Sequence, residues 1–170
     1  NCDSTTTTVY FAGGYSGVSA PYTAFVGKSN GSADNFTDIS ISHTLPGGVN
    51  SIKVLKEGNK NNIIAVGDNE LVYWSDNAGQ SWTASTITFS GGNADMKTVV
   101  SDRDNTGLNV WTMGDAGIIH YSSDGGKNFT QQTVVPVTGG SPLPDSIGLD
   151  LHLGKDTGNL YALTTGGSGA

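Results

Sequence analysis

The chain has 170 residues, the size of one ordinary domain, and its single Cys excludes a scaffold held together by internal disulfides. Its 15 Asp and Glu outweigh 8 Lys and Arg, so it lacks the basic surface that a nucleic acid or an anionic membrane requires. Only 14% of the residues are charged, and the abundant Gly, Ser, Thr and Asn favour short strands and turns over a helical bundle.

Short runs rich in β-branched and aromatic residues, separated by turn residues, follow one another along the chain. In chain order they predict strands over 8–13, 22–28 and 35–41, then over 49–56, 61–67, 70–75 and 81–88, then over 96–101, 108–114, 117–122 and 128–135, and finally over 147–153 and 159–164. The middle of the chain therefore contains two complete groups of four strands.

These groups are copies of one repeat. Segment 65–82 aligns without gaps on segment 112–129, 47 residues later. A degenerate copy of residues 75–82 lies 46 residues upstream, at 29–36. Four strands in about 47 residues is the period of a β-propeller blade. We therefore predict an all-β fold of four-stranded antiparallel blades, with residues 1–170 forming a single propeller sector.

The repeat divides this sector into a partial blade at 8–48, blades at 49–95 and 96–145, and a partial blade at 146–170. About three to four blades rarely close a ring, because known propellers use about four to eight, and every blade has two apolar faces that need covering. We expect further repeats of a longer protein, or another chain, to complete the ring. An open stack is the alternative, but the terminal strands 9–12 and 160–163 carry no charges that would blunt an exposed edge.

A short motif, Ser-x-Asp-x-Gly-x-x-aromatic, recurs at the same place in each repeat. Its members are Ser122, Asp124, Gly126 and Phe129 in one copy and Ser75, Asn77, Gly79 and Trp82 in the other. The Asp or Asn can accept hydrogen bonds from backbone N–H groups of the turn, and the Gly permits a positive φ. The aromatic ring then enters the next strand, so the motif is interpreted as a lock on a hairpin.

This motif resembles the Asp-box, or BNR repeat, of sialidases, xyloglucan-degrading glycoside hydrolases, sortilin-type receptors and photosystem II assembly factors. Segments 65–82 and 110–129 look most like the assembly-factor type. The resemblance implies a propeller whose boxes lie at the outer rim, away from the axial site, and it identifies a fold better than an activity.

The sequence does not contain a convincing set of the catalytic residues that sialidases and glycosidases need. A sialidase would need three arginines around a carboxylate, but Arg103 is the only one present, so sialidase activity from this chain alone is excluded. A glycosidase needs two carboxylates about 5 to 9.5 Å apart, and Glu57 and Glu70 are the only glutamates. Asp150 and His152 alternate with leucines on a predicted innermost strand and could face an axial pocket; alternatively, they form the polar side of a half-buried strand.

Two further acids, Asp68 and Asp115, occupy equivalent turns between the second and third strands of their repeats. They could line an acidic ligand face, although turn chemistry explains them equally well. His43 and His120 have no Cys or His partner at metal-like spacing, so neither a metal nor another cofactor is predicted.

No apolar run approaches roughly 20 residues, so no membrane span is predicted. The low charge, the abundance of Ser, Thr, Gly and Asn, and the possible sequons favour a secreted or cell-surface protein. Sequons at Asn30, Asn35 and Asn128 are candidate N-glycosylation sites, while Cys2 could be free or paired outside the chain. The predicted function is a noncatalytic propeller module, structural or binding a protein or glycan partner. The alternatives are a sector of an Asp-box glycoside hydrolase and an assembly-factor-like scaffold.

Overall fold

The computed structural model describes residues 8–30, 35–55, 62–88, 94–102, 108–133, 148–154 and 159–164. These residues form β-strands and turns, with one short 3₁₀ turn, η1 (Asp115–Gly117). Within this part of the chain, no helix has the length and apolar character needed to cross a bilayer.

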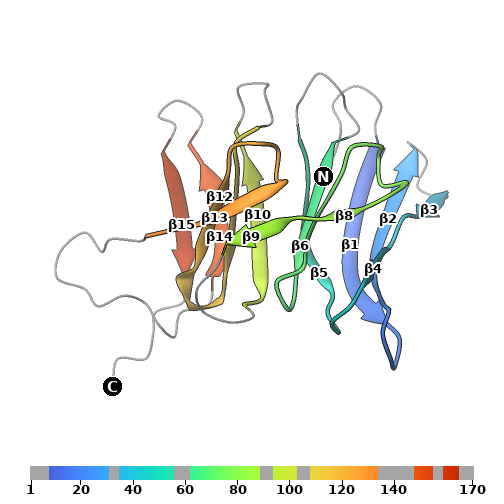
Figure 1. Ribbon diagram of the computed structural model, residues 1–170. Helices are drawn as coiled ribbons and strands as arrows, with labels where there is room; N and C mark the ends of the chain where they lie inside the picture. The colour runs from blue at the N-terminus through green and yellow to red at the C-terminus, as the bar shows by residue number, and fades with distance from the viewer. Residues whose placement is uncertain are drawn as a thin grey trace.

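Four sheets follow one another in chain order (Figure 1). The first contains β1 (Thr8–Ser16), β2 (Tyr22–Asn30), β3 (Phe36–Asp38) and β4 (Ile41–His43), with β2 at its centre. The second contains β5 (Val49–Val54), β6 (Ile63–Gly67), β7 (Val72–Ser75) and β8 (Thr83–Ala84) in that order. The third contains β10 (Met96–Ser101), β11 (Val110–Gly114), β12 (Ile119–Ser122), β13 (Asn128–Gln132) and β9 (Thr86–Thr88), and the fourth contains β14 (Gly148–Leu153) and β15 (Leu160–Thr164).

Every predicted strand has a counterpart, but two of them break in an unexpected way. The strand predicted over 35–41 becomes β3 and β4, and the strand predicted over 81–88 becomes β8 and β9. The second break occurs because backbone hydrogen bonds change partner there: Ser85 N donates to Val72 O in its own sheet, whereas Thr86 N donates to Lys127 O in the next. As a result β9 pairs in parallel with β13 and ties the second sheet to the third.

The strands that begin the later sheets lie next to one another. β5 contacts both β1 and β10, and β10 contacts β14. These strands therefore form the inner edge of the stack, from which successive sheets radiate as the blades of a propeller do.

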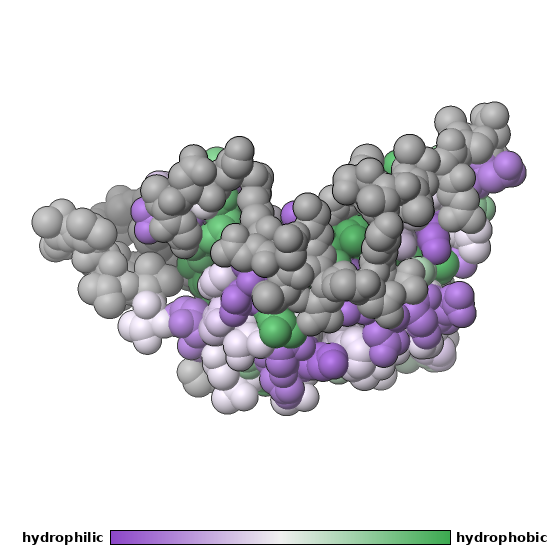
Figure 2. Space-filling model, turned by 90° about the horizontal axis from the view of Figure 1, so that it is seen from above, coloured by the Kyte–Doolittle hydropathy of each residue, from purple (hydrophilic) through white to green (hydrophobic). Residues whose placement is uncertain are grey.

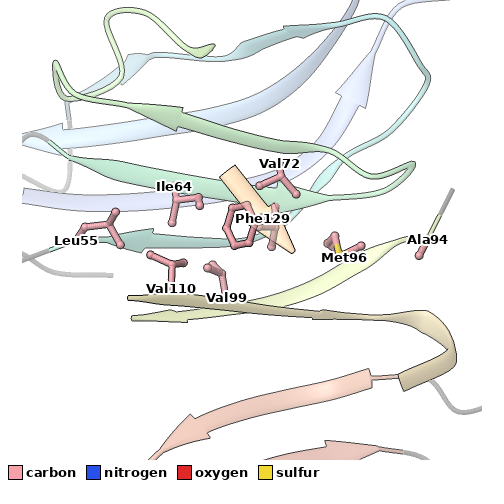
Figure 3. Close-up of a cluster of buried hydrophobic side chains, with 9 residues drawn as sticks. Leu55, Ile64, Val72, Ala94, Met96, Val99, Val110 and Phe129 are labelled. Carbon is pink, nitrogen blue, oxygen red and sulfur yellow. The ribbon is translucent and has the colours of Figure 1, made fainter. Parts of the chain in front are cut away.

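The hydrophobic core lies between the sheets. Ala24, Val26, Ile41, Val49, Ala65 and Leu71 fill the junction of the first and second sheets. Leu55, Ile64, Val66, Val72, Ala94, Met96, Val99, Val110 and Phe129 fill the junction of the second and third (Figure 3). Alternate residues of β6 belong to different clusters, which explains why the whole strand is buried, as expected for a sheet covered on both faces.

The face of the molecule seen from above (Figure 2) is more polar than the core between the sheets. Seen from above, the described residues are mostly hydrophilic, and hydrophobic residues are visible only in small separate patches (Figure 2). The buried apolar clusters hold one sheet against the next, although some large apolar side chains, such as Phe36 and Leu163, are exposed elsewhere on the molecule.

Candidate functional site

The turn at residues 122–129 is closed by the side chains of its Ser and Asp. Ser122 Oγ accepts hydrogen bonds from the backbone N–H groups of Gly126, at 2.9 Å, and Asp124, at 3.3 Å, and donates one to Asp124 Oδ1 at 2.7 Å. Asp124 Oδ1 also accepts from the N–H groups of Lys127 and Asn128, both at 3.0 Å, and Asp124 Oδ2 accepts from Asn128 Nδ2 at 2.6 Å. Both side chains therefore accept hydrogen bonds from the backbone N–H groups of the turn.

The turn at residues 75–82 repeats this geometry with an amide in place of the carboxylate. Ser75 Oγ accepts from the N–H groups of Gly79, at 2.9 Å, and Asn77, at 3.3 Å. Asn77 Oδ1 accepts from Ser75 Oγ and from Ser81 N, both at 2.9 Å. Since an Asn oxygen accepts like a carboxylate oxygen, the negative charge is not needed to close this turn. We call 75–82 and 122–129 the box turns.

Each box turn presses its glycine against the preceding sheet. Gly79 and Gly126 have φ values of +83° and +85°, in the region that disfavours other residues. A Cβ on Gly79 would lie 2.4 Å from Ile39 Cδ1, and one on Gly126 would lie 2.4 Å from Ile64 Cδ1. The glycine is therefore required both for the turn and for the close approach of two sheets.

The aromatic residue of each box turn reaches into the same junction. Trp82 packs against the core between the first and second sheets, and its Nε1 donates a hydrogen bond to Ile39 O at 2.6 Å. Phe129 is 1% exposed within the core between the second and third sheets (Figure 3). The structure thus places the eight residues of the motif in two equivalent inter-sheet clamps.

The second box turn offers a direct test of this structural role. We expect Asp124→Ala to lower the free energy of unfolding by about 1–3 kcal/mol, because it leaves turn N–H donors without their acceptor. Asp124→Asn should cost less than about 1 kcal/mol at neutral pH, since Asn77 performs the same task in the first box turn. Urea unfolding of both variants measures the difference.

The pH dependence of Asp124 provides a second readout of the same pair of variants. Burial acts to raise the pKa of Asp124, but hydrogen bonds from Asn128, Ser122 and Lys127 outweigh it and lower the pKa below the usual 3.8. The charged form therefore stabilises the fold above about pH 3.8, and this contribution is lost as the pH falls through the lower folded-state pKa. Asp124→Asn should remove this acid-side loss; equal costs for the Ala and Asn variants would contradict the proposed acceptor role.

Asp68 and Asp115, the predicted ligand-face acids, are brought together by a lysine. Lys97 Nζ lies 3.1 Å from Asp95 Oδ2, 3.6 Å from Asp115 Oδ2 and 4.0 Å from Asp68 Oδ1. We call these four residues the Lys97 cluster. It joins the second and third sheets, so the two acids face a cation of the protein itself rather than open solvent alone.

Two acids of the Lys97 cluster, Asp68 and Asp95, also accept hydrogen bonds from amide or backbone donors. Asn50 Nδ2 donates to Asp68 Oδ1 at 2.8 Å, and Asn69 N donates to Asp95 Oδ1 at 2.9 Å. The hydrogen bond from Asn69 is the main reason that the pKa of Asp95 is lowered, against the opposing effect of burial. Burial acts to lower the pKa of Lys97, but its hydrogen bond to Asp95 and the charges of the three acids raise it overall. The charged forms of Asp95 and Lys97 are therefore favoured at neutral pH.

Sequence reasoning missed Asp95 and Lys97. A signal was available for Lys97, because it occupies the repeat position of Asn50, just as Asp115 occupies that of Asp68. The amide of Asn50 and the ammonium of Lys97 each face the acid of their own repeat. Aligning the first strands as well as the motifs would have paired them.

Asp150 and His152 lie exposed on one face of β14, opposite the buried Leu151. Asp150 Oδ1 accepts a hydrogen bond from Leu151 N at 2.9 Å and a longer one from Thr98 Oγ1 at 3.4 Å. Among the described residues, no hydrogen bond connects Asp150 to the Lys97 cluster. The predicted ligand-face residues thus fall into two separate groups.

The histidines considered as metal ligands are buried in the sheets. His43 lies on β4, with Nδ1 3.3 Å from the hydroxyl of Tyr73, and burial lowers its pKa. His120 lies on β12 and is 1% exposed, and burial lowers its pKa to about 4. Within the described ranges, no group of three His, Cys, Asp or Glu side chains is arranged to hold a metal ion.

Of the predicted glycosylation sites, Asn35 and Asn128 are exposed. Asn30 ends β2, and its side chain lies outside the described part of the structure, as do Cys2, Glu57 and Arg103. The amide of Asn128 is hydrogen bonded to Asp124, as described above.

A small pocket lies beside the second box turn. It has a volume of about 60 Å³ and is lined by Trp74, Asp76, Asp124 and Lys127, among others. Lys127 Nζ sits 5.1 Å from the centre of the Trp74 ring, in a cation–π contact. Ligand pockets for small molecules usually measure about 300–1,000 Å³, so this one is suited to a few waters at most.

The sequence matches no protein family and no curated protein, but it resembles solved structures. An ancestral GH74 enzyme matches over 98% of this chain with a TM-score of 0.62 and 21% sequence identity. YCF48 from Cyanidioschyzon merolae matches over 71% of this chain and 35% of its own, with a TM-score of 0.46 and 22% identity. YCF48 bound to a D1 peptide matches over 85% of this chain and 70% of its own, with a TM-score of 0.33 and 14% identity.

The chain spans only 23% of the length of the GH74 enzyme. At this sequence identity the likeness concerns the fold alone, and together with the radiating antiparallel sheets it shows that this chain has the blade architecture of a β-propeller.

Proposed function

We propose that this chain is part of a noncatalytic β-propeller, a structural and protein-binding module of a secreted or surface-exposed assembly. The main observation behind the proposal is that the carboxylates of this chain make hydrogen bonds and ion pairs that hold the fold together. Asp124 closes a box turn, while Asp68, Asp95 and Asp115 surround Lys97 between two sheets. Each is an acceptor or ion-pair partner inside the fold.

These arrangements are the opposite of what acid–base hydrolysis needs. A glycosidase requires one carboxyl group that remains protonated, which means a raised pKa, and a second that faces the substrate. In this chain hydrogen bonds lower the pKa of both Asp95 and Asp124. Such acids are stabilised as permanent anions and serve well as fixed structural charges.

The exposure of two sequon asparagines supports a secreted location. Asn35 and Asn128 are exposed, so a glycan on either could extend into solvent. Mass spectrometry of the native protein tests this part of the proposal: a glycan on at least one of the two asparagines is expected, and unmodified asparagines in eukaryotic material would contradict it.

A second candidate function is a sector of a glycoside hydrolase, with an assembly-factor-like scaffold as a further version of the noncatalytic proposal. Asp150 favours the hydrolase, because it is exposed on β14, at the inner edge of the stack where a propeller carries its axial site. The fold likeness to a GH74 enzyme is compatible with it.

Hydrolysis assays on the full-length protein separate these functions. The wild type and Asp150→Asn are incubated with xyloglucan and with sialylated glycans, and both are screened for binding on a glycan array. We expect no turnover by either protein. Turnover by the wild type that is lost in Asp150→Asn would overturn the noncatalytic proposal and assign Asp150 to catalysis.

A further inference from the structure

We propose that the hairpin joining β1 and β2, together with the acids beside it, binds a segment of a partner protein in which a Lys or Arg side chain lies next to an apolar one. This inference rests on the protein-binding function proposed above and names the chemistry of the partner. The hairpin belongs to the first sheet and projects beyond the turn between β6 and β7 at the lower side of Figure 1.

Backbone hydrogen bonds align the first sheet on the second. Val26 O of β2 accepts one from Ile39 N, and Val72 O of β7 accepts one from Ser85 N, both at 2.9 Å. Each donor lies 13 residues after its acceptor, so β2 corresponds to β7. The antiparallel strand before each of them also corresponds, so β1 matches β6.

The hairpin is an insertion into this repeat. In the second and third sheets the same connection is a tight turn of five residues, 67–71 and 114–118, between paired residues of the two strands. In the first sheet thirteen residues, 13–25, separate the corresponding pair, Ala12 and Val26. Insertions into single repeats lie in loops on one face of a repeat protein, which is often its binding face.

Apolar side chains of this hairpin are exposed. Val18 at its tip is fully exposed, and Tyr15 is 51% exposed and packs edge to face on Tyr22, with ring centroids 6.1 Å apart. Tyr15 pairs with Ala24, which is buried in the junction with the second sheet, so Tyr15 lies on the face of the first sheet that looks toward that sheet. Its exposure therefore comes from the length of the hairpin, which extends past the short turn at 67–71. We call Tyr15, Val18 and Tyr22 the hairpin surface.

The base of the hairpin lies beside the acids of the Lys97 cluster. A Cβ on Gly48 would lie 3.0 Å from Gly14 Cα in the hairpin, and Gly48 N donates a hydrogen bond to Asp68 Oδ2 at 3.2 Å. Lys97 connects Asp68 with Asp115. The side chains of the three acids in the cluster are 35–39% exposed, so a partner can reach them although they are paired inside the fold.

The charges on this face select a cationic partner. Three carboxylates share one ammonium in the Lys97 cluster, and Glu70 adds another acid on the turn at 67–71. Residues 13–25 of the hairpin carry no charge. A neutral glycan or a zwitterionic lipid would use the hairpin surface but not the acids, and an anionic membrane would be repelled by them. A Lys or Arg next to an aliphatic or aromatic residue uses both features at once.

The proposed function and this inference can fail separately. Polysaccharide turnover that is lost in Asp150→Asn would overturn the noncatalytic function, whatever the hairpin variants do. Peptide binding that does not depend on the hairpin would overturn this inference without producing any turnover.

The probe is a random library of short peptides displayed on phage. The library is selected in parallel on the wild type and on a Tyr15→Ser/Val18→Ser double variant. We expect the peptides enriched only on the wild type to contain a Lys or Arg beside an aliphatic or aromatic residue. The most enriched peptide is then synthesised with a fluorescent label and titrated with each protein by fluorescence anisotropy.

The double variant should bind this peptide at least about 10-fold more weakly, because it loses two apolar contacts. Asp115→Asn should weaken binding by about 2- to 5-fold, the usual range for an exposed ion pair, and the loss should shrink at high salt. Phe36→Ser is the matched control: Phe36 is an exposed aromatic residue of the same sheet, but it lies on β3, which pairs with the far end of β2. Its affinity for the peptide should equal that of the wild type.

Three results would overturn the proposal. The first is a peptide that binds the wild type and the double variant equally, and the second is enrichment without basic residues. The third is binding to a neutral glycan on an array, or to phosphatidylcholine vesicles, that is lost in the double variant, since either would identify a different occupant. Val18→Ser alone repeats the test at a fully exposed position, where a loss of binding does not come from a loss of stability.

Discussion

Phe129→Ala is expected to lower the free energy of unfolding by about 3–5 kcal/mol, the usual cost of truncating a buried Phe. Phe129 is 1% exposed, and the second sheet packs around it through Ile64, Val66 and Val72 (Figure 3). Its removal leaves a cavity at the junction between the two sheets. Urea unfolding of the purified chain, followed by tryptophan fluorescence, measures the change.

Phe36→Ala is the matched control for this prediction. Phe36 holds the same place in its repeat but is 56% exposed, so the same truncation should cost less than about 1 kcal/mol. If the two variants lost equal stability, the burial of Phe129 between two sheets would not be the source of its contribution.

A marked loss of stability is expected as the pH falls from about 6.5 to about 4. Burial lowers the pKa of His120 from its usual 6.5 to about 4, so the unfolded chain takes up a proton on this histidine before the folded chain does. Stability from this group is therefore fully present above pH 6.5 and is lost as the pH falls through the folded-state pKa. The loss amounts to about 3 kcal/mol, at 1.36 kcal/mol for each unit of pKa difference.

His120→Leu separates this effect from the titration of other groups, because leucine fills a similar volume and has no group that titrates. Chemical unfolding at a series of pH values should show a shallower slope between pH 6.5 and 4 for the variant than for the wild type. The slope should not vanish, since burial also lowers the pKa of His43. Parallel pH profiles for the two proteins would disprove the assignment to His120.

The order of strands could be predicted from the sequence because the same pattern of strand segments and turn residues occurs twice. The alignment of 65–82 with 112–129 indicated which segments form strands, although several strand ends differ by two or three residues from those predicted. The motif residues also anticipated the hydrogen bonds of Ser122 and Asp124. The departure of β9 to the third sheet could not be predicted. It depends on a backbone hydrogen bond from Thr86 N to Lys127 O, between residues 41 positions apart. The local sequence of 81–88 does not indicate which distant residue it will pair with.

The candidate site was anticipated only in part. The equivalence of Asp68 and Asp115 was visible in the sequence, but the contact of Lys97 with Asp68 arises from the packing of β10 against β5 and β6 of the second sheet. Likewise, the motif marked Gly79 and Gly126 as turn residues, whereas their close approach to Ile39 and Ile64 is a tertiary feature. Local chemistry can be read from one repeat, but contacts between repeats require knowing how the sheets stack.

The claim on which this account depends is that each box turn holds its sheet on the preceding one. A double-mutant cycle between Ile64→Ala in the second sheet and Phe129→Ala in the third, measured by urea unfolding, tests it most directly. The account predicts a coupling free energy of about 1 kcal/mol or more, within the range found for residues in contact. Losses that simply add, to within about 0.3 kcal/mol, would contradict it.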